Sequence, residues 1–335
     1  MLTLATQPGT SQSSQTQHSQ DRLRIFSGSA NPPLAEKIAN YLGVNLGRVT
    51  RKHFADGEAY IQFQESIRGC DVFLLQPTCN SVNERLMELL IMIDACKRAS
   101  ARQVTAVLPY YGYARADRRS SGRESITAKL VSDLIAQSGA TRVLALDLHS
   151  PQIPAYFDIP IDHVSGFPVL VQHLLERRIE NPVVVSPDIG GVSRARAFAK
   201  ALGDAPLAII DKRRATDTAD IAASTINVIG DVEGKTAILV DDIIDTGSTL
   251  HRAACALRNA GVVEVVACAC HGVLSAPAIP KLNSDEFDEV IITDTIPLGD
   301  AQQFSKLTIL TVADLLGESI RRIHQGISVS DMLSS

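Results

Sequence analysis

The stretch that decides the fold is AILVDDIIDTGST, residues 237–249. It opens with a short apolar strand, residues 237–240, which ends in the adjacent carboxylates Asp241 and Asp242. A short loop with hydroxyl residues and Gly247 then leads into a segment with helical periodicity, residues 249–259. Because a buried apolar strand that feeds a helix is the building unit of parallel sheets, the stretch predicts α/β architecture.

The rest of the chain alternates in the same way between apolar strands and amphipathic helices. Asn31 is expected to cap a further helix that starts at Pro32. The predicted strands are residues 72–75, 104–108, 143–147, 183–186, 207–210, 237–240, 262–269 and 290–292, and the predicted helices are residues 82–99, 126–137, 192–201, 249–259 and 312–324. Ligands of such sheets bind beyond the carboxyl ends of the strands.

The strand–loop–helix pattern occurs twice. In the first half, the strand at residues 104–108 opens into a charged loop, residues 113–123, and then a helix. We therefore predict two related α/β domains, residues 21–165 and 166–335. Residues 1–20 are rich in Ser, Gln and Thr, a composition that buries too little surface to order itself, and are predicted to form a disordered tail.

Composition excludes several classes of protein. A net charge of -5 argues against a nucleic-acid binder, which usually carries a basic surface. No apolar stretch reaches the roughly 18 residues that span a bilayer, so we expect a soluble, cytoplasmic protein without membrane contact. Cys268, Cys270 and His271 suggest a metal site, but they lie in an apolar run that is better explained as a buried strand.

The loop after the decisive strand has the chemistry of a phosphorylated-sugar site. Backbone N–H groups and hydroxyls of Thr246, Gly247, Ser248 and Thr249 can surround a phosphate at a helix N-terminus. The preceding acidic pair can accept hydrogen bonds from sugar hydroxyls. The alternative is that Asp245 or Ser248 only caps the helix, which leaves the acidic pair unexplained.

This loop is similar to the phosphoribosyl-diphosphate loop of type I phosphoribosyltransferases, and further motifs identify the chain as a member of the ribose-phosphate diphosphokinase family. The resemblance implies two tandem type I phosphoribosyltransferase domains. It also implies transfer of the β,γ-diphosphoryl group of Mg-ATP to the C1 hydroxyl of ribose 5-phosphate, which gives 5-phosphoribosyl 1-diphosphate and AMP. The motifs, in chain order, lie at residues 54–58, 109–119, 146–152, 186–196, 211–214 and 238–249.

The resemblance also assigns roles to residues. Ala116 departs from the family pattern, which usually has Gln there. By analogy, ATP is bound by Phe54, Asp56, Glu58, Arg115, Asp117 and His149, and ribose 5-phosphate is bound by Asp241, Asp242, Asp245, Thr246, Gly247, Ser248 and Thr249. The analogy gives Mg²⁺ the ligands His149 and Asp188, and it makes Lys212, Arg214 and His149 catalytic. It also implies that Ser66 and Arg68 form a regulatory anion site.

The same resemblance implies a homohexamer that inorganic phosphate activates and ADP inhibits. Two alternatives are weighed against it. A phosphoribosyltransferase shares the 241–249 loop but has no need of the adenine motif at residues 54–58, and a non-catalytic regulatory homologue is expected to lose the catalytic residues that this chain keeps. All of these assignments require the ATP-binding residues of the first half and the sugar-phosphate loop of the second half to face one cleft.

Overall fold

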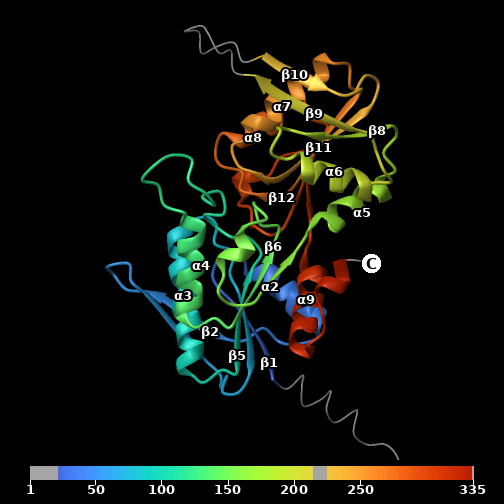
Figure 1. The fold of residues 1–335 in the computed structure, drawn as a ribbon. Helices are drawn as coiled ribbons and strands as arrows, with labels where there is room; N and C mark the ends of the chain where they lie inside the picture. Colours follow the sequence, from blue (N-terminus) through green and yellow to red (C-terminus); the bar gives the residue numbers. More distant parts are fainter. Residues whose placement is uncertain (1–21, 214–224, 334–335) are drawn as a thin grey trace, which may run out of the picture.

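The computed structural model describes residues 22–213 and 225–333. They form two mainly parallel sheets that lie end to end, each with helices on its faces (Figure 1). This confirms the predicted α/β class. The chain builds the first sheet, then the second, so the two strand–loop–helix units noted in the sequence belong to different sheets.

The first sheet has the strand order β1-β4-β5-β6-β7, and all of its pairings are parallel. Apolar residues on one face pack against helices α3 and α4, and those on the other face pack against α2. The elements are β1 (Leu23–Ser27), α2 (Pro32–Leu42), β4 (Asp71–Leu75), α3 (Val82–Arg98), β5 (Gln103–Leu108), α4 (Thr127–Ser138), β6 (Arg142–Leu146) and β7 (Ile161–Val164).

The second sheet has the order β10-β9-β8-β11-β12-β13-β14, and only the β10–β9 pair is antiparallel. Helices α5 and α6 cover one face, and α7 and α8 cover the other. The elements are α5 (Phe167–Arg177), β8 (Pro182–Ser186), α6 (Val192–Ala201), β9 (Leu207–Arg213), β10 (Thr225–Ile229), β11 (Thr236–Ile244), α7 (Ser248–Asn259), β12 (Glu264–Gly272), α8 (Ala278–Leu282), β13 (Glu289–Thr293) and β14 (Leu307–Leu310).

The last long helix, α9 (Ala313–Gln325), returns to the first sheet. Figure 1 shows it beside α2, and its apolar face (Leu316, Ile320) joins the same core as Leu34 and Ile38 of α2. The Tyr41 hydroxyl also donates to Glu318, at 3.2 Å. The predicted domain boundary near residue 165 stays a prediction, and the C-terminal helix adds a second covalent path between the two sheets.

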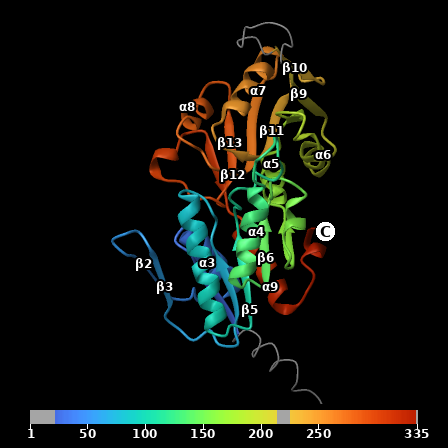
Figure 2. The same cartoon turned by 60° about the vertical axis from the view of Figure 1, so that its left-hand side comes forward.

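A two-stranded hairpin, β2 (Val49–His53) and β3 (Ala59–Phe63), was not predicted from the sequence. It extends away from the first sheet beside α3 (Figure 2), and its tip contains residues 54–58. Most side chains on β2 are exposed, so the strands lack the strong hydrophobic alternation that identifies a strand in sequence.

Most predicted elements are found within a few residues of their expected bounds, and helix α6 has the predicted ones. Asn31 caps α2 as expected, because its Oδ1 accepts from the N–H of Leu34 at 3.3 Å. The predicted strand end at Val240 is wrong: β11 continues to Ile244 and includes both carboxylates. Among the described residues, no helix combines the length and apolar character that a membrane span requires.

Candidate active site

The acidic pair lies inside β11, between its partner strands at the carboxyl edge of the second sheet. Asp242 is buried, whereas Asp241 is partly exposed. One guanidinium nitrogen of Arg194, from α6, lies 2.9 Å from Oδ1 of Asp241 and 2.8 Å from Oδ1 of Asp242. The arginine therefore balances two adjacent negative charges that would otherwise repel each other.

His149 links this pair to the first sheet. It follows β6, and its Nδ1 lies 2.6 Å from Oδ2 of Asp242. The hydrogen bond to Asp242 raises the pKa of His149, and its effect exceeds the opposing effect of burial. Burial alone would raise the pKa of Asp242, but the hydrogen bond with His149 and the charge of Arg194 lower it well below its usual range. Asp242 therefore stays ionised, and the imidazole turns its Nε2 away from it.

Asp241 is in a different electrostatic state from its neighbour. Burial and the negative charge of Asp242 raise the pKa of Asp241, although Arg194 opposes this shift. This carboxyl can donate a hydrogen bond to a sugar hydroxyl when it is protonated and can accept one when it is ionised.

Asp245 forms a second link between the sheets. Its Oδ2 lies 2.6 Å from a guanidinium nitrogen of Arg115, which comes from the loop after β5. The hydroxyl of Ser275 donates to its other oxygen, at 2.5 Å. Burial would raise the pKa of Asp245, but these two partners outweigh it and lower the pKa. Arg115, a cation from the first half of the chain, thus contacts the loop that begins at Asp245 in the second half.

The loop from Asp245 to α7 has the geometry of an anion site. Gly247 adopts the left-handed conformation, with φ of 67°, and an added Cβ would lie 3.3 Å from Leu282. The N-cap residue of α7 is Gly247, which has no side chain to cap the helix, and only a long contact of 3.5 Å joins the N–H of Ser248 to Oγ1 of Thr246, so N–H groups of the first turn are available to an anion in the loop. A cavity of about 300 Å³ is lined here by Arg115, Asp241, Asp245, Thr246, Gly247, Ser248 and Thr249, among others.

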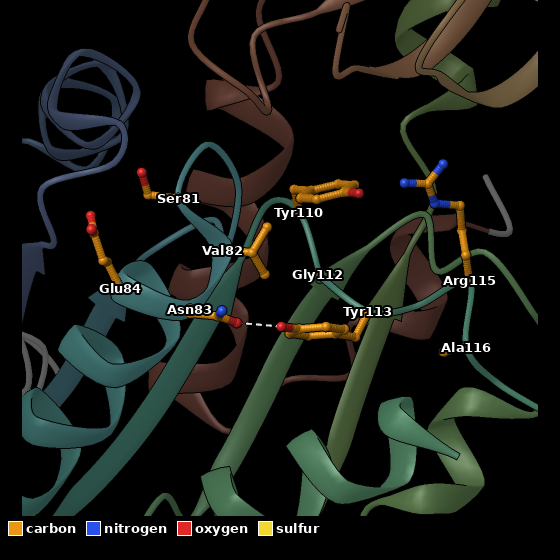
Figure 3. A pocket seen from close by; sticks show the side chains of 9 residues that line it. All are labelled: Ser81, Val82, Asn83, Glu84, Tyr110, Gly112, Tyr113, Arg115 and Ala116. Atoms are coloured by element: carbon orange, nitrogen blue, oxygen red, sulfur yellow. Dashed lines mark hydrogen bonds between the residues drawn. The ribbon is translucent and has the colours of Figure 1, made fainter. Parts of the chain in front are cut away.

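A larger cavity, about 450 Å³, begins on the other side of Arg115. Figure 3 shows its lining: Tyr113 and Asn83 are hydrogen-bonded to each other, while the guanidinium of Arg115 extends away from them. Ala116 also lines this cavity. Arg115 lines both this cavity and the cavity at the start of α7, so the two cavities form a row that is joined at Arg115.

A third cavity, about 520 Å³, continues the row toward the hairpin. It shares Asn83 and Glu84 with the previous cavity, and Glu58 lines it. Phe54 and Asp56 line none of these three cavities; the Phe54 ring is 57% exposed at the hairpin tip. Within one chain, the structure thus brings Arg115, His149 and the 241–249 segment together, but not the whole predicted adenine motif.

Other predicted residues lie apart from these cavities or outside the described part. Asp117 is buried and accepts from Gln152. Asp188 is exposed in the turn after β8, where its Oδ1 accepts from the N–H of Gly191 at 2.9 Å, and Ser66 and Arg68 are exposed between β3 and β4. Arg214 and the side chain of Lys212 lie outside the described residues.

His271 forms a third link between the sheets, at the end of β12. It is buried, and its ring nitrogens lie 3.0 Å from the Thr295 hydroxyl and 3.0 Å from the backbone oxygen of Asp147, two residues before His149. The ring of Tyr110 lies edge-on to it, 5.1 Å away between centroids. Burial lowers the pKa of His271, so this link is neutral. Cys268 and Cys270, its neighbours in β12, are fully buried thiols.

Three residues of the site were not assigned a role from the sequence. They are Arg194, which holds both carboxylates, Ser275, which fixes Asp245, and Lys281 of α8, whose Nζ lies 2.6 Å from the Ser248 hydroxyl. Arg194 was visible in its motif, after a strand exit and two glycines. Ser275 and Lys281 carry no local signal, because only the fold brings them to the loop.

Two family models match the chain. One describes the N-terminal domain of ribose phosphate pyrophosphokinase and matches residues 23–139. The other describes a phosphoribosyl synthetase-associated domain and matches residues 216–334. The two matches fall on the two halves of the chain.

Curated proteins and a solved structure are similar over nearly the full length. The ribose-phosphate pyrophosphokinase of Nostoc sp. is 62% identical over 311 residues, which cover 93% of each chain. Ribose-phosphate pyrophosphokinase 5, chloroplastic, of Arabidopsis thaliana is 61% identical and covers 92% of this chain and 78% of its own. The crystal structure of phosphoribosylpyrophosphate synthetase from Mycobacterium smegmatis superimposes with a TM-score of 0.87 at 44% identity, over 91% of this chain and 99% of that one.

Proposed function

The chain belongs to the ribose-phosphate pyrophosphokinase family and makes 5-phosphoribosyl 1-diphosphate from ATP and ribose 5-phosphate, and we propose that it does so in the row of cavities centred on Arg115. One observation carries this location. Two contacts of 2.6 Å, Arg115–Asp245 and His149–Asp242, join the carboxyl edges of the two sheets at one place. Cations of the first half and the sugar-phosphate loop of the second half thus share a cleft.

Ribose 5-phosphate is proposed to occupy the cavity at the start of α7. The N–H groups of the first helical turn and the hydroxyls of Thr246, Ser248 and Thr249 surround its phosphate. Lys281 adds a positive charge from α8. Asp241 lines this cavity and Asp242 follows it in β11; both are proposed to accept hydrogen bonds from the ribose hydroxyls, and Arg194 contacts both carboxylates.

ATP is proposed to bind on the first-half side of Arg115, with its phosphates toward that guanidinium and toward His149. Guanidinium is a good partner for phosphate oxygens, and the phosphates would compete with Asp245 for it. The adenine motif of Phe54, Asp56 and Glu58 lies on the hairpin at the far end of the row of cavities. Because Phe54 is exposed, we propose that the hairpin closes over the base from this chain or from a neighbouring subunit of the expected homohexamer.

Mg²⁺ is proposed to bind between Asp188 and His149. Asp188 offers a carboxylate oxygen, the ligand that Mg²⁺ prefers, and the Nε2 of His149 is directed away from Asp242. A bound Mg²⁺ would neutralise charge on the phosphate oxygens of ATP. With Nε2 available to the ion, His149 donates its Nδ1–H to Asp242, and Arg115 supplies the protein's positive charge to the phosphates.

In the proposed reaction, the C1 oxygen of ribose 5-phosphate attacks the β-phosphorus of ATP, the bond to the α,β-bridging oxygen breaks, and AMP leaves. The proton of the C1 hydroxyl is lost to solvent or to a nearby base. The protein contributes position and positive charge, so most of the acceleration is electrostatic. Lys212 and Arg214 are proposed to add charge over the diphosphate, and Ser66 and Arg68 to bind effector anions such as phosphate or the phosphates of ADP.

The test is AMP release from Mg-ATP, measured with and without ribose 5-phosphate and with and without inorganic phosphate. We expect AMP only when ribose 5-phosphate is present, in equal amount to 5-phosphoribosyl 1-diphosphate, and more of it with phosphate. The location is tested separately by Arg115→Ala, which should weaken ATP use while the protein stays folded. Wild-type turnover with an unchanged Arg115→Ala variant would leave the activity intact and refute the location.

A further inference from the structure

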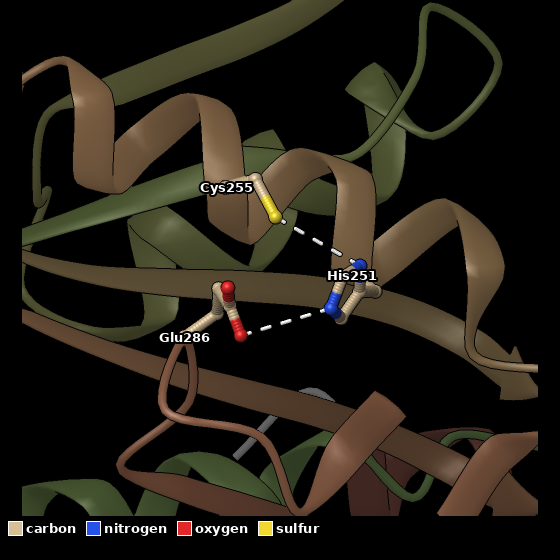
Figure 4. Close-up of side chains that lie close together, drawn as sticks. All are labelled: His251, Cys255 and Glu286. Carbon is tan, nitrogen blue, oxygen red and sulfur yellow. Dashed lines mark hydrogen bonds and ion pairs between the residues drawn. The ribbon is translucent and has the colours of Figure 1, made fainter. Parts of the chain in front are cut away.

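A cluster of three possible metal ligands lies on α7, away from the cavities described above. His251 and Cys255 are one helical turn apart and therefore share a face of the helix. Glu286 reaches them from the segment between α8 and β13, and Figure 4 shows the three side chains converging. The proposed reaction uses none of them.

The distances fit a small cation. Sγ of Cys255 lies 3.8 Å from Nδ1 of His251, and Oε2 of Glu286 lies 3.7 Å from Nε2 of the same ring. One ligand atom from each residue can be chosen so that all three lie within 4.8 Å of one another. A tetrahedral ion with bonds of about 2.3 Å to sulfur and about 2.1 Å to nitrogen separates these two atoms by roughly 3.6 Å, close to the spacing found.

The donor set indicates which cation. A thiolate and an imidazole suit Zn²⁺, whereas Mg²⁺ prefers oxygen ligands, so this cluster would not compete for the ion of the reaction. The side chains of His251 and Glu286 are 30% and 32% exposed, so an ion and a water ligand can reach them.

We propose that His251, Cys255 and Glu286 form a Zn²⁺ site with one position left for water. Cys255 binds as the thiolate and releases its proton to solvent. The ion replaces the weak Cys255–His251 contact, and the imidazole binds through one nitrogen while the carboxylate of Glu286 completes the set. No hydrogen bond of the proposed active site is lost.

The site lies directly behind the proposed phosphate loop. The N–H of His251 donates to the carbonyl of Gly247, at 2.9 Å, so His251 belongs to the first turns of the helix that holds the phosphate. An ion shared with Glu286 would tie this end of α7 to the segment before β13. Zn²⁺ should therefore raise the melting temperature of the whole protein.

The experiment uses the full chain, freed of metal with a chelator, kept reduced with a phosphine, and supplied with excess Mg²⁺. Co²⁺ is titrated in as a spectroscopic probe, and Zn²⁺ binding is then measured by displacement of Co²⁺. We expect about one Co²⁺ per chain with a thiolate-to-cobalt charge-transfer band and visible bands of tetrahedral intensity. Added Zn²⁺ should abolish both.

Cys255→Ser is the test variant, and His173→Asn is its matched control. His173 faces Glu289 at 3.8 Å, a spacing like that of His251 and Glu286, but among the described residues this pair has no third ligand placed to complete a metal cluster. We expect Cys255→Ser to lose the charge-transfer band and to bind Zn²⁺ at least roughly tenfold more weakly. We expect His173→Asn to behave as wild type.

Two outcomes would overturn the proposal. One is a wild-type protein without a thiolate band, and the other is a band that persists in Cys255→Ser, since the other described thiols are Cys70, Cys79, Cys96, Cys268 and Cys270. Circular dichroism of metal-free Cys255→Ser establishes that the variant is folded. If it is not, Glu286→Gln, which keeps the side-chain shape, replaces it and should weaken Zn²⁺ binding in the same direction.

Discussion

The two ends of the sheets use ion pairs in different ways. At the carboxyl ends, Arg115–Asp245 and His149–Asp242 join residues of different sheets beside cavities. At the amino ends, Asp71 of β4 pairs with Arg102 and with His324 of α9, and Arg177 of α5 pairs with Glu264 and Glu289, the first residues of β12 and β13. These second pairs tie helices and loops to the strands that they cover.

This difference indicates which of the ion pairs the substrates are expected to replace. A phosphate that binds Arg115 is expected to replace Asp245 as a partner that this guanidinium already has in the free protein. The charges of the cleft therefore stay hydrogen-bonded in both states. At the amino ends, no substrate is expected, and we expect the pairs to act on stability.

The largest expected effect comes from Asp242→Asn. The variant keeps the shape of the side chain but removes the charge shared by His149 and Arg194. We expect kcat/KM to fall by about 10²–10³-fold, as is usual when one preorganised charge partner is lost. Steady-state kinetics with both substrates measure it.

The control for Asp242→Asn is Asp231→Asn, an exposed carboxylate that pairs with Lys235 before β11. A further readout is the pKa of His149, followed by NMR. Because the hydrogen bond to Asp242 raises this pKa, the variant should lower it. An unchanged kcat/KM would show that the cleft pairs, like those at the amino ends, are only structural.

The next largest effect is expected for Arg115→Ala. Its pair with Asp245 is more than half exposed on the arginine side, so folding stability should change by less than about 1 kcal/mol. The KM for ATP should rise by about 10- to 100-fold, because a charged hydrogen bond contributes about 1.5–3 kcal/mol.

Arg98→Ala is the matched control, since Arg98 forms an exposed pair with Asp94 on α3. It should change neither the KM for ATP nor stability. If Arg115→Ala lost stability but kept its KM, the pair would belong with the structural ones, and the contrast between the two ends would fail.

His271→Phe tests the neutral link between the sheets. The ring keeps its contact with Tyr110 but leaves the backbone oxygen of Asp147 without its partner. We expect a loss of about 1–3 kcal/mol in the free energy of unfolding, the usual effect of an unsatisfied buried polar group. Urea denaturation measures it, and His173→Phe, at a half-exposed site, is the comparison expected to change little.

The smallest effect on turnover is expected at the amino end, for Asp71→Asn. Burial alone would raise the pKa of Asp71, but its hydrogen bonds with His324 and Arg102 lower it. A lowered folded pKa means that the ionised group stabilises the protein above the unfolded value, near 3.9, and that this contribution is lost as the pH falls through the folded value. The variant should be less stable at neutral pH, and the difference should shrink in acid.

Thermal unfolding of Asp71→Asn and of the wild type, measured from neutral pH down to pH about 3, tests this difference in stability. Turnover at neutral pH should stay at the wild-type value wherever the protein is folded. A large loss of turnover in the folded variant would show that the amino ends also take part in the reaction.

Local sequence was sufficient for most elements and for the chemistry of the strand ends. Apolar runs predict strands whatever their partners, and parallel strands bring their carboxyl ends to one edge. For this reason the sequence predicts a ligand site at the segment 241–249, and the family resemblance adds Arg115 to it. Strand β2 of the hairpin escaped prediction because most of its side chains are exposed, and the true end of β11 was missed because two acids interrupt its apolar pattern.

Sequence by itself therefore determined the α/β class, the family and the residue types at the cleft. Only the tertiary structure decided which charges meet: Asp242 with His149, Asp245 with Arg115, both acids with Arg194, and Lys281 with Ser248. Periodicity and turn chemistry act over a few neighbouring residues. Pairing between groups that are far apart in the chain depends on strand order and on how the two sheets lie against each other, which no short stretch encodes.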